Sequence, residues 1–418
     1  MNKIIVIGGG PAGMLAAVSA SKENTKVILL EKNDRLGKKL FITGKGRCNI
    51  TNSADKDVIM KNIMTNPKFM FSALDVFDNS DICRLLEEHG CKVKEERGGR
   101  IFPVSDHSSD VIRALSKMLD EKNVEVRLNS EVKSIEKNGD VFKISLKDKK
   151  VLECDALILT TGGLSYPGTG STGDGLKFAQ AFGHSIKECT PSLVPFETKQ
   201  LWCKELQGLS LKNTGLKMYS GGKLIYEDFG EMLFTHFGIS GPMVLSASSY
   251  YHKRKADDCL VVLDLKPALS EDELDDRLLR EISDNHEKHF INMLPDLLPS
   301  KMVPVIASLS GIDPHKKCGD IIKEERKNLV RILKNLEIDI TGTRGYDEAI
   351  ITRGGISVKE VSPKNMMSKI VSGLFIAGEI LDLDALTGGF NLQIAWSTGY
   401  LAGIGATEYL EGSKGETE

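Results

Sequence analysis

Three glycines near the N-terminus, Gly8, Gly10 and Gly13, have the spacing of a turn that binds a dinucleotide. The first glycine permits a tight turn, the second lets a pyrophosphate approach the backbone, and the third lets helix and strand pack closely. A helix that begins at Pro11 and Ala12 would direct its N–H groups and the positive end of its dipole toward the phosphates. The spacing therefore predicts that the chain binds an adenine dinucleotide.

The elements around these glycines follow the order that the pattern requires. Residues 3–7 and 26–30 are apolar and β-branched, as in buried parallel strands, and residues 12–22 are small and helix-forming. Glu31 ends the second strand, where a carboxylate can hydrogen-bond the adenosine ribose. A lone glycine pattern carries little information, but this complete strand–helix–strand unit with its acid predicts a Rossmann-type fold.

Two further strand ends favour FAD over NAD. Residues 155–161 and 373–379 are predicted as buried strands, and they end beside Gly162-Gly163 and at Gly378-Glu379. Both ends would bring backbone amides to one edge of the sheet, as a flavin dinucleotide lying across it requires. The sequence lacks a second complete glycine pattern, so we predict no separate NAD(P)H domain.

The rest of the chain predicts an insertion within a discontinuous first domain. Residues 193–265 alternate like strands, with Gly221-Gly222 as a hairpin turn, whereas a capping box at Ser270 opens a charged helical region. We therefore predict an α/β fold of three parts. They are a FAD-binding domain at 1–190 and 350–418, a β-rich inserted domain at 191–270 and 339–349, and a helical subdomain at 271–338.

Smaller elements of the first domain are also predicted from periodicity. Helices are expected at 79–90 and 108–122, followed by an antiparallel meander of 124–129, 131–137 and 141–147. Residues 36–52 are rich in glycine and lysine without either periodicity, and we predict a loop there.

Composition excludes several classes of protein. The net charge of −3 gives no general attraction to nucleic acid or to anionic membranes, although 55 lysines and arginines can still cluster locally. The eight cysteines form no C-x-x-C pair and no zinc pattern, so neither a metal nor an iron–sulfur cluster is predicted. Apolar runs fall short of the roughly 20 residues that span a bilayer. We expect a soluble cytoplasmic protein with reduced thiols and no membrane partner.

Several segments together resemble one known family. The sequence resembles the HI0933-like family of FAD-dependent oxidoreductases, often labelled aminoacetone-oxidase-like, in the glutathione-reductase structural superfamily. The resemblance covers essentially the whole chain in order, including the insertion. The segments that carry it are Gly44-Lys-Gly-Arg-Cys-Asn49 with Thr51-Asn52, Phe234-Thr-His-Phe-Gly-Ile-Ser-Gly-Pro242, Arg353-Gly-Gly355, and Gly378-Glu379 with Thr387-Gly-Gly-Phe-Asn-Leu-Gln393.

The resemblance implies a FAD site made of two halves. The N-terminal turn, Glu31 and Lys32 would hold the ADP, and Val132 would meet the adenine through its backbone. Residues 43–49 and 387–393 would surround the ribityl chain and the isoalloxazine. The predicted cofactor-binding residues are Gly8, Gly10, Pro11, Ala12, Gly13, Glu31, Lys32, Thr43, Gly44, Gly46, Arg47, Cys48, Asn49, Val132, Thr161, Gly162, Gly163, Gly378, Glu379, Thr387, Gly388, Gly389, Phe390, Asn391, Leu392 and Gln393.

Within this site, Gly388-Gly389 precede a helix whose N-terminus would favour negative charge on a reduced flavin. The amides of Asn391 and Gln393 could read the pyrimidine edge of the ring. Arg47 and Lys45 could bind phosphate or polarise a carbonyl, or be solvated loop charges.

Three residues are candidates for catalysis, and each also has a structural interpretation. Cys48 could donate a proton, or be a small buried residue. His236 could face the substrate or satisfy a structural hydrogen bond. Arg353, beside two glycines, could bind a carbonyl or an anion.

The resemblance implies NAD(P)H-driven reduction of a carbon–carbon double bond conjugated to a carbonyl, with NAD(P)H as a transient donor to FAD. Family members include a reductase of 3-oxo-Δ4,6 bile acids and enzymes that reduce a uridine of large-subunit ribosomal RNA. We expect a small-molecule substrate and leave rRNA open. The alternatives are an amine or aminoketone oxidase that uses oxygen, and a flavin-binding redox sensor without turnover.

Overall fold

A parallel sheet of five strands, in the order β19-β10-β1-β2-β6, carries the N-terminal glycine turn. The chain adds β2 and β6 on one side of β1, and then β10 and β19 on the other. The order therefore reverses between β1 and β10, which is where open α/β sheets bind their ligands. The strands are β1 (Asn2–Ile7), β2 (Thr25–Leu30), β6 (Glu125–Arg127), β10 (Ala156–Leu159) and β19 (Leu374–Ile376).

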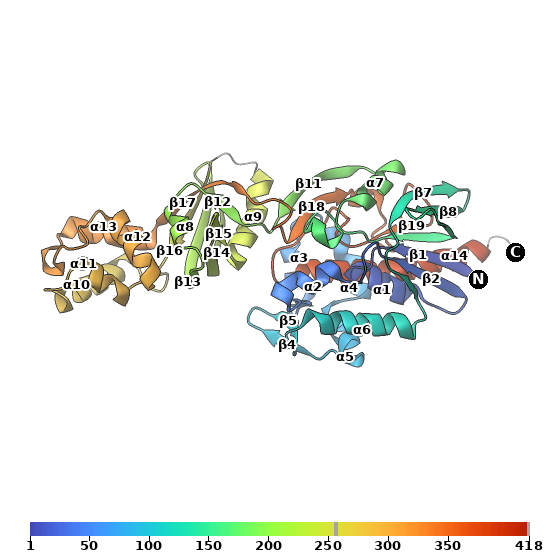
Figure 1. Ribbon diagram of the computed structural model, residues 1–418, viewed down its shortest axis with the longest axis horizontal. Coiled ribbons are helices and arrows are strands. Elements are labelled where there is room, and N and C mark those ends of the chain that lie inside the picture. Colours follow the sequence, from blue (N-terminus) through green and yellow to red (C-terminus); the bar gives the residue numbers. More distant parts are fainter. Residues whose placement is uncertain (255–257, 416–418) are drawn as a thin grey trace. The chain divides into compact units, whose positions relative to one another are not determined.

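The computed structural model describes residues 1–254 and 258–415, which form two compact units (Figure 1). Unit 1 comprises Met1–Ser192 and Tyr346–Glu418, and unit 2 comprises Leu193–Gly345. The predicted FAD-binding range runs to residue 418, and its last three residues lie outside the described part. The α/β class and the Rossmann-type fold are confirmed by the sheet order and by the β1–α1–β2 unit.

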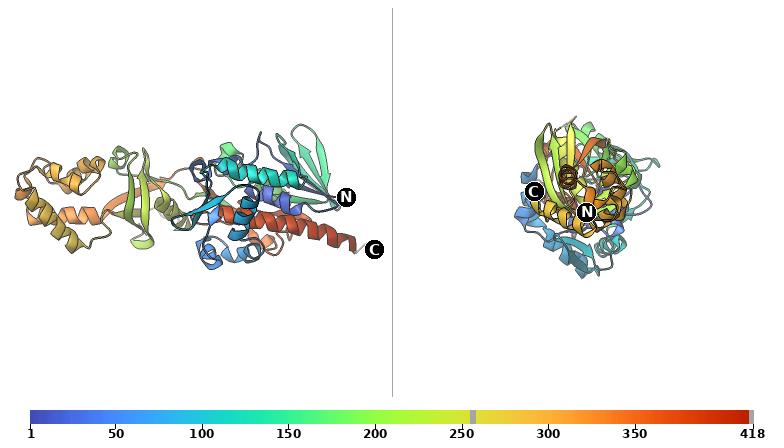
Figure 2. Two further views of the ribbon diagram at one scale, coloured as in Figure 1. Left: turned by 90° about the horizontal axis from the view of Figure 1, so that it is seen from below. Right: turned by 90° about the vertical axis from the view of Figure 1, so that its left-hand side faces the viewer.

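Helix α1 (Pro11–Ala20) packs against the long helix α14 (Phe390–Gly415), which runs without interruption (Figure 2). Glycines on α14 allow this close approach. A Cβ on Gly399 would lie 2.3 Å from Ala12 O, and one on Gly403 would lie 2.3 Å from Ala16 O. The small-residue composition of both helices therefore fixes the C-terminal segment against the N-terminal turn.

The remaining elements of unit 1 form smaller layers around the sheet. Helix α6 (Ser108–Glu121) packs on α1 and α2 (Lys38–Ile42), and β7, β8 and β9 form an antiparallel sheet. Strands β11 (Ile186–Ser192) and β18 (Ile351–Ile356) pair with each other. The others are β3 (Thr51–Asn52), α3 (Lys56–Asn62), α4 (Phe71–Val76), α5 (Asn79–Glu88), β4 (Val93–Glu96), β5 (Arg100–Pro103), β7 (Val132–Asn138), β8 (Val141–Leu146), β9 (Val151–Cys154) and α7 (Asp174–Ala181).

Two sequence predictions for unit 1 were wrong. Residues 124–129 do not join the meander, because β6 pairs in parallel with β2, and the meander is completed instead by β9. Residues 36–52 are not one loop: α2 and a 3-10 turn (Thr43–Gly46) precede β3. Each of these elements is short and gains its order from tertiary packing, which periodicity does not register.

Unit 2 is built on a closed barrel of six strands in the order β12-β15-β14-β13-β16-β17. Gly221 and Gly222 form the predicted hairpin turn between β13 and β14, with φ angles of 53° and 72°. Its elements outside the helical insert are β12 (Phe196–Thr198), α8 (Trp202–Glu205), β13 (Ser210–Ser220), β14 (Lys223–Phe234), β15 (Gly238–Ser240), α9 (Pro242–Arg254), β16 (Cys259–Asp264) and β17 (Leu336–Thr343).

Four helices are inserted between β16 and β17, which are neighbours in the barrel: α10 (Glu271–Asp284), α11 (Phe290–Met293), α12 (Val303–Ser310) and α13 (Lys323–Lys334). The capping box predicted at Ser270 is present, with Glu273 as its partner. Pro295 and Pro304 lie in the first turns of short helices, as expected of helix-breaking residues. The predicted helical range ended at 338, but β17 begins at Leu336.

Candidate functional site

The turn between β1 and α1 is closed by contacts that only glycine allows. Gly8 has φ 108°, and a Cβ on Gly13 would lie 1.8 Å from Gly8 O. Thr160 holds the turn from β10, since its Oγ1 donates to Ile7 O or Gly8 O, at 2.9 and 3.0 Å. A Cβ on Gly10, by contrast, would meet nothing within 4 Å. The turn is therefore rigid, with open space in front of Gly10.

The N-terminus of α1 faces this space without a side-chain cap. Its N-cap is Gly10, Pro11 occupies the first turn, and that turn carries no acidic residue among those described. The N–H groups at such a terminus have no partner within the helix, and they bind phosphates readily. The empty volume at Gly10 and the uncapped helix fit the pyrophosphate of FAD.

Glu31 fastens this turn to the end of β2. Its Oε2 accepts from Gly9 N at 2.7 Å, and its Oε1 accepts from Asn33 N and Asn33 Nδ2 at 2.8 and 2.7 Å. Glu31 is 7% exposed as a residue, and its backbone oxygen accepts from Ser130 N at 2.8 Å; Val132, the predicted adenine contact, is buried at the start of β7. Glu31 thus shapes the turn, and its contact with the ribose stays a prediction.

Lys32 contacts two side chains near the start of α7. Its ammonium donates to Thr172 Oγ1 at 2.6 Å and pairs with Asp174 Oδ2 at 2.7 Å. Burial would raise the pKa of Asp174, but the hydrogen bonds from Lys32 and Thr172 and the charges of Lys32 and Lys177 together outweigh it, and the pKa is lowered. The ammonium is thus bound by Thr172 and by Asp174 at the start of α7, and its contact with the ADP stays a prediction.

The loop of residues 43–49 turns through several left-handed positions. Gly44, Lys45, Gly46 and Cys48 have φ of 59°, 59°, 83° and 61°. When the side-chain amide of Asn49 is oriented so that its nitrogen faces the carbonyl oxygens of Thr51 and Ile101, its oxygen accepts a hydrogen bond from Gly389 N at 3.0 Å. The two segments predicted to surround the flavin ring, 43–49 and 387–393, are therefore in contact.

Arg47 does not extend from this loop toward a ligand. Its guanidinium pairs with Glu96 and with Asp106 Oδ1, the latter at 2.6 Å, and stacks over the Phe102 ring at 4.2 Å. These hydrogen bonds, Glu96 first, raise the pKa of Arg47. The residue is held in an ion-pair network beside β4 and β5, and its role in binding the cofactor stays a prediction.

Cys48 is fully buried in the core of unit 1. Burial raises the pKa of its thiol to about 12, and a hydrogen bond with Thr43 opposes this only in part. The thiol is therefore neutral and shielded from solvent, which favours the structural interpretation of this residue.

The segment 387–393 is fixed by its own side chains. Asn391 Oδ1 accepts from Ala385 N and its Nδ2 donates to Ala385 O, both at 2.8 Å. Gln393 Oε1 accepts from Thr51 Oγ1 at 2.6 Å and its Nε2 donates to Ser397 Oγ at 2.9 Å. Both amides have hydrogen-bond partners within the protein, and their contact with the flavin ring stays a prediction. The backbone of Thr387, Gly388, Gly389, Phe390 and Leu392 remains the part of this segment predicted to line the cofactor.

Glu379, at the end of β19, belongs to a network that sequence reasoning missed. Its Oε2 accepts from Lys39 Nζ at 2.6 Å, and its Oε1 accepts from Ser165 Oγ at 2.7 Å and from Thr352 N at 3.0 Å. Gly163 adjoins it, since a Cβ there would lie 2.4 Å from Thr352 Oγ1. Lys39 lies in a stretch without periodicity, so no sequence signal marked it.

Thr161 and Gly162 complete this edge of the sheet. Gly162 has φ 73°, and Thr161 Oγ1 is buried without a hydrogen-bond partner among the described residues. An orphaned hydroxyl just beyond the carboxyl end of β10, where a Cβ on Gly175 would lie 2.0 Å from it, fits a polar cofactor at this edge.

The remaining catalytic candidates lie on different units. Arg353 is on β18 of unit 1, and its Nη2 donates to Asp384 Oδ2 at 3.1 Å. Asp384, which sequence reasoning also missed, is fully buried; a carboxylate in the apolar stretch 380–386 was the available signal. His236 belongs to unit 2, where it is exposed and its ring meets Phe237 edge-on at 4.9 Å.

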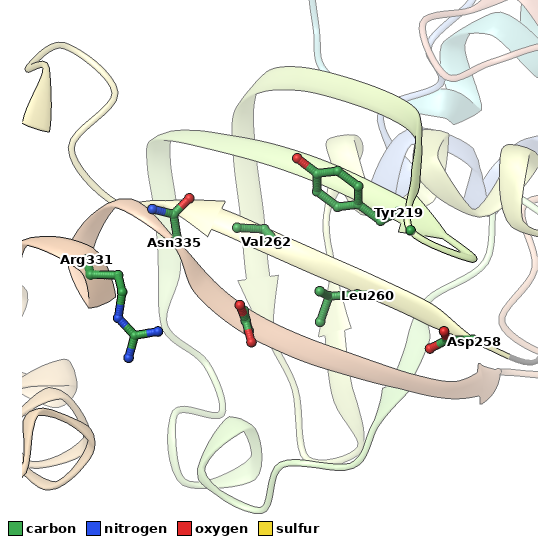
Figure 3. Close-up of a pocket in the computed structure, with 8 residues that line it drawn as sticks. Tyr219, Asp258, Leu260, Val262, Arg331 and Asn335 are labelled. Atoms are coloured by element: carbon green, nitrogen blue, oxygen red, sulfur yellow. The ribbon is translucent and has the colours of Figure 1, made fainter. Parts of the chain in front are cut away.

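A pocket of about 500 Å³ lies on the outside of the barrel (Figure 3). Leu260 and Val262 of β16 form its middle, with Arg331 and Asn335 at one end and Asp258 at the other. It contains none of the predicted site residues.

Among residues 1–254 and 258–415, no cluster of three metal-ligating side chains is present. The same residues include no helix with the length and apolarity of a membrane span.

Comparison with known proteins assigns the family. Residues 2–405 match the family model described as HI0933-like protein Rossmann domain, and the chain belongs to this family. It is 30% identical over 414 residues to the 3-dehydro-bile acid delta(4,6)-reductase of Clostridium scindens, covering 98% of this chain and 100% of that one. It is 33% identical over 407 residues to the ribosomal RNA dihydrouridine synthase of Haemophilus influenzae, covering 96% and 97%.

A solved structure shows the same fold. The 3-ketosteroid delta1-dehydrogenase of Sterolibacterium denitrificans superposes with a TM-score of 0.52 at 14% identity, covering 97% of this chain and all of that one. Together with the glycine turn and the sheet edge, the family confirms the predicted recognition and the enzyme class. The protein is an FAD-dependent oxidoreductase.

Proposed function

We propose that this oxidoreductase uses NAD(P)H to reduce a carbon–carbon double bond conjugated to a carbonyl in a small-molecule substrate. The observation that carries the proposal is the similarity, over nearly the full length, to two relatives with different substrates and one shared chemistry. One is named for reducing a dienone of a bile acid, and the other for making dihydrouridine, which is uridine with its ring double bond reduced.

The chain's own residues would divide the work between holding the cofactor and activating the substrate. The turn from Gly8 to Gly13 would hold the pyrophosphate, and the backbones of 43–49 and 387–393 would hold the ring half. FAD, when bound, supplies the hydride that reaches the β-carbon. Arg353 or His236 would donate a hydrogen bond to the substrate carbonyl, which stabilises the negative charge that develops there.

The second hydrogen enters the product as a proton. Cys48 was one predicted donor, but its buried thiol is a weak acid, so we assign the proton on the α-carbon to water or to another acid of the chain. The balance is one hydride and one proton added across the double bond, with NAD(P)H oxidised to NAD(P)⁺.

An anaerobic titration with NADH and NADPH tests the electron donor. The flavin absorbance should bleach with one nicotinamide, and a 3-oxo-4,6-diene steroid should restore it with loss of the dienone absorbance. Bleaching reversed only by oxygen, with release of peroxide, would contradict the proposal and support an oxidase.

The same assay separates the two substrate classes. An unmodified fragment of large-subunit rRNA takes the place of the steroid as oxidant. Restored flavin colour and dihydrouridine in that fragment, with no response to the steroid, would assign the RNA reaction instead. Binding to RNA would then weaken as salt is raised, since phosphate contacts release counterions.

A further inference from the structure

The Arg353 guanidinium has more hydrogen-bonding capacity than its surroundings use. Its side chain is 13% exposed, and Nη2 is the nitrogen that reaches Asp384 Oδ2, at 3.1 Å. Its Nε and Nη1 are buried without a hydrogen-bond partner among the described residues, and Asp384 Oδ1 is in the same state. Buried donors of a charged group are rarely left unmet. The pattern therefore points to a polar ligand.

The backbone around Arg353 is tightly held. Gly354 and Gly355 follow with φ of 86° and 126°, and a Cβ on each would lie 2.1 Å from Glu188 O and 2.4 Å from Ile380 O. Asp384 is fully buried and also lies 3.5 Å from Ser192 Oγ. The unmet donors are thus fixed in place rather than free to turn toward solvent.

Asp384, the partner of Arg353, lies in the chain between two segments that are predicted to hold the flavin. Residues 380–386 connect Gly378-Glu379 to 387–393, and Ala385 is bound by Asn391 at both backbone atoms. On the other side, Asp382 N donates to Ile356 O of β18 at 2.9 Å. Substrate and flavin must meet, so this connector is a suitable position for a substrate-binding group.

The charges around Arg353 and Asp384 indicate which kind of ligand this site would bind. Asp384 neutralises Arg353, and Asp382 adds a second carboxyl nearby, hydrogen-bonded by Asn66 Nδ2 at 3.1 Å. Burial raises the pKa of Asp382, and the charge of Asp384 adds to this while Asn66, Lys187 and Arg353 oppose it. The two acids balance the charges of Lys187 and Arg353, so another anion would meet no net positive charge. A neutral carbonyl oxygen would accept hydrogen bonds without adding charge.

We infer that Arg353 binds the carbonyl oxygen of a neutral conjugated ketone or amide through Nε and Nη1, and that Asp384 is the positioning residue that excludes carboxylates from this site. The inference rests on the proposed function for the identity of the substrate class. It chooses Arg353 over His236 as the carbonyl donor and assigns Asp384 a role.

Ligand binding to the oxidised holoenzyme tests this without turnover. Cyclohex-2-enone and cyclohex-1-ene carboxylate form a matched neutral and anionic pair, and the difference spectrum of the flavin reports both. Wild-type protein should bind the enone at least about tenfold more tightly than the carboxylate. Asp384→Asn should reverse this preference, because it leaves the arginine charge unbalanced. Arg353→Gln should weaken the enone about tenfold or more and leave the carboxylate weak.

The control is Asp110→Asn, which breaks the exposed pair with Arg113 on α6 and should change neither ligand. The inference would be overturned if Asp384→Asn weakened the binding of both ligands equally, or if wild-type protein bound the carboxylate more tightly than the enone. If Asp384→Asn does not fold, Arg353→Gln decides, because unchanged enone binding there contradicts it. If binding follows the expected pattern but NAD(P)H reduces no double bond, the proposed reaction fails and the carbonyl site stands.

Discussion

Glu31 Oε2 accepts a hydrogen bond from Gly9 N at 2.7 Å, so the acid at the end of β2 holds the glycine turn at the end of β1. The carboxylate that sequence patterns assign to a ribose is thus also a structural part of the phosphate-binding turn. If the turn binds the pyrophosphate as predicted, cofactor affinity depends on this carboxylate through the backbone of the turn.

We therefore expect Glu31→Ala to weaken FAD binding by about tenfold or more, since a charge-assisted hydrogen bond contributes about 1.5–3 kcal/mol. The measurement is FAD retained after desalting, together with a fluorescence titration of the apoprotein. Glu153→Ala, on the exposed strand β9, is the control and should retain FAD. Full retention in Glu31→Ala would contradict the role assigned to this carboxylate.

Gly10 and Gly13 should respond differently to the same substitution. Gly10 has φ −84° and open space around a Cβ, so Gly10→Ala should fold normally and lose FAD affinity by about tenfold or more. A Cβ on Gly13 would clash with Gly8 O, so Gly13→Ala should destabilise the apoprotein by about 3 kcal/mol. Urea unfolding of the apoproteins separates the two. Equal stability losses would show that the space at Gly10 is not open.

Lys39 and Glu379 form a largely buried ion pair, with side chains 18% and 16% exposed. Lys39→Met should destabilise the apoprotein by about 2–4 kcal/mol because it leaves the Glu379 carboxylate buried without its partner. Lys39→Met combined with Glu379→Met should recover most of that loss. Denaturant unfolding of both variants measures this, and a double variant no better than Lys39→Met would contradict it.

His184 predicts a pH dependence of stability. Its side chain is fully buried beside Glu360 and Ser368, and burial lowers its pKa below the ordinary value of 6.5, although Glu360 opposes the shift. The unfolded chain therefore binds a proton at higher pH than the native protein does. This contribution to stability is present above about pH 6.5 and is lost as the pH falls below it.

Substitution of His184 by Asn should flatten the change in unfolding free energy between about pH 5 and pH 6.5 relative to wild type. The measurement is urea unfolding at several pH values. The exposed His286, beside Glu287, supplies the control His286→Asn. An unchanged slope in His184→Asn would show that another group titrates there.

Cys48 should be inert in the native protein. With a pKa of about 12 and no exposed surface, it should resist iodoacetamide at about pH 8 while the partly exposed Cys83 and Cys189 react faster. Peptide mapping by mass spectrometry measures the labelling of each thiol. Rapid modification of Cys48 in folded holoenzyme would return it to the list of proton donors.

The parts of the fold that the sequence predicted are those written in local patterns. The β1–α1–β2 unit, the Gly221-Gly222 hairpin and the Ser270 cap each need only neighbouring residues. The strand β6 was misassigned because its three residues take their partner from β2, and nothing local distinguishes that pairing from a meander. The pairing of such short elements depends on contacts between residues far apart in the chain, and local sequence patterns do not reveal those contacts.

The same distinction between local patterns and long-range contacts applies to the candidate site. The glycines and Glu31 could be placed because backbone geometry demands their types. The contacts of Arg47, Asn391 and Gln393 could not, because Asp106 and Thr51 come from distant segments and the bonds between Asn391 and Ala385 close a loop without a regular pattern. Lys39 and Asp384 were missed because a single charged residue forms no recognisable sequence pattern. Their roles depend on the residues that surround them in the folded protein.

The pairing of β10 with β19 and of α1 with α14 has a consequence for synthesis on the ribosome. Residues 193–345 are synthesised before residues 374–376 and 390–415, so the barrel unit can begin to fold first. Until then the nascent Rossmann sheet keeps β10 as an open edge and α1 without its helical neighbour. Stable capture of the cofactor must therefore follow synthesis of β19 and α14.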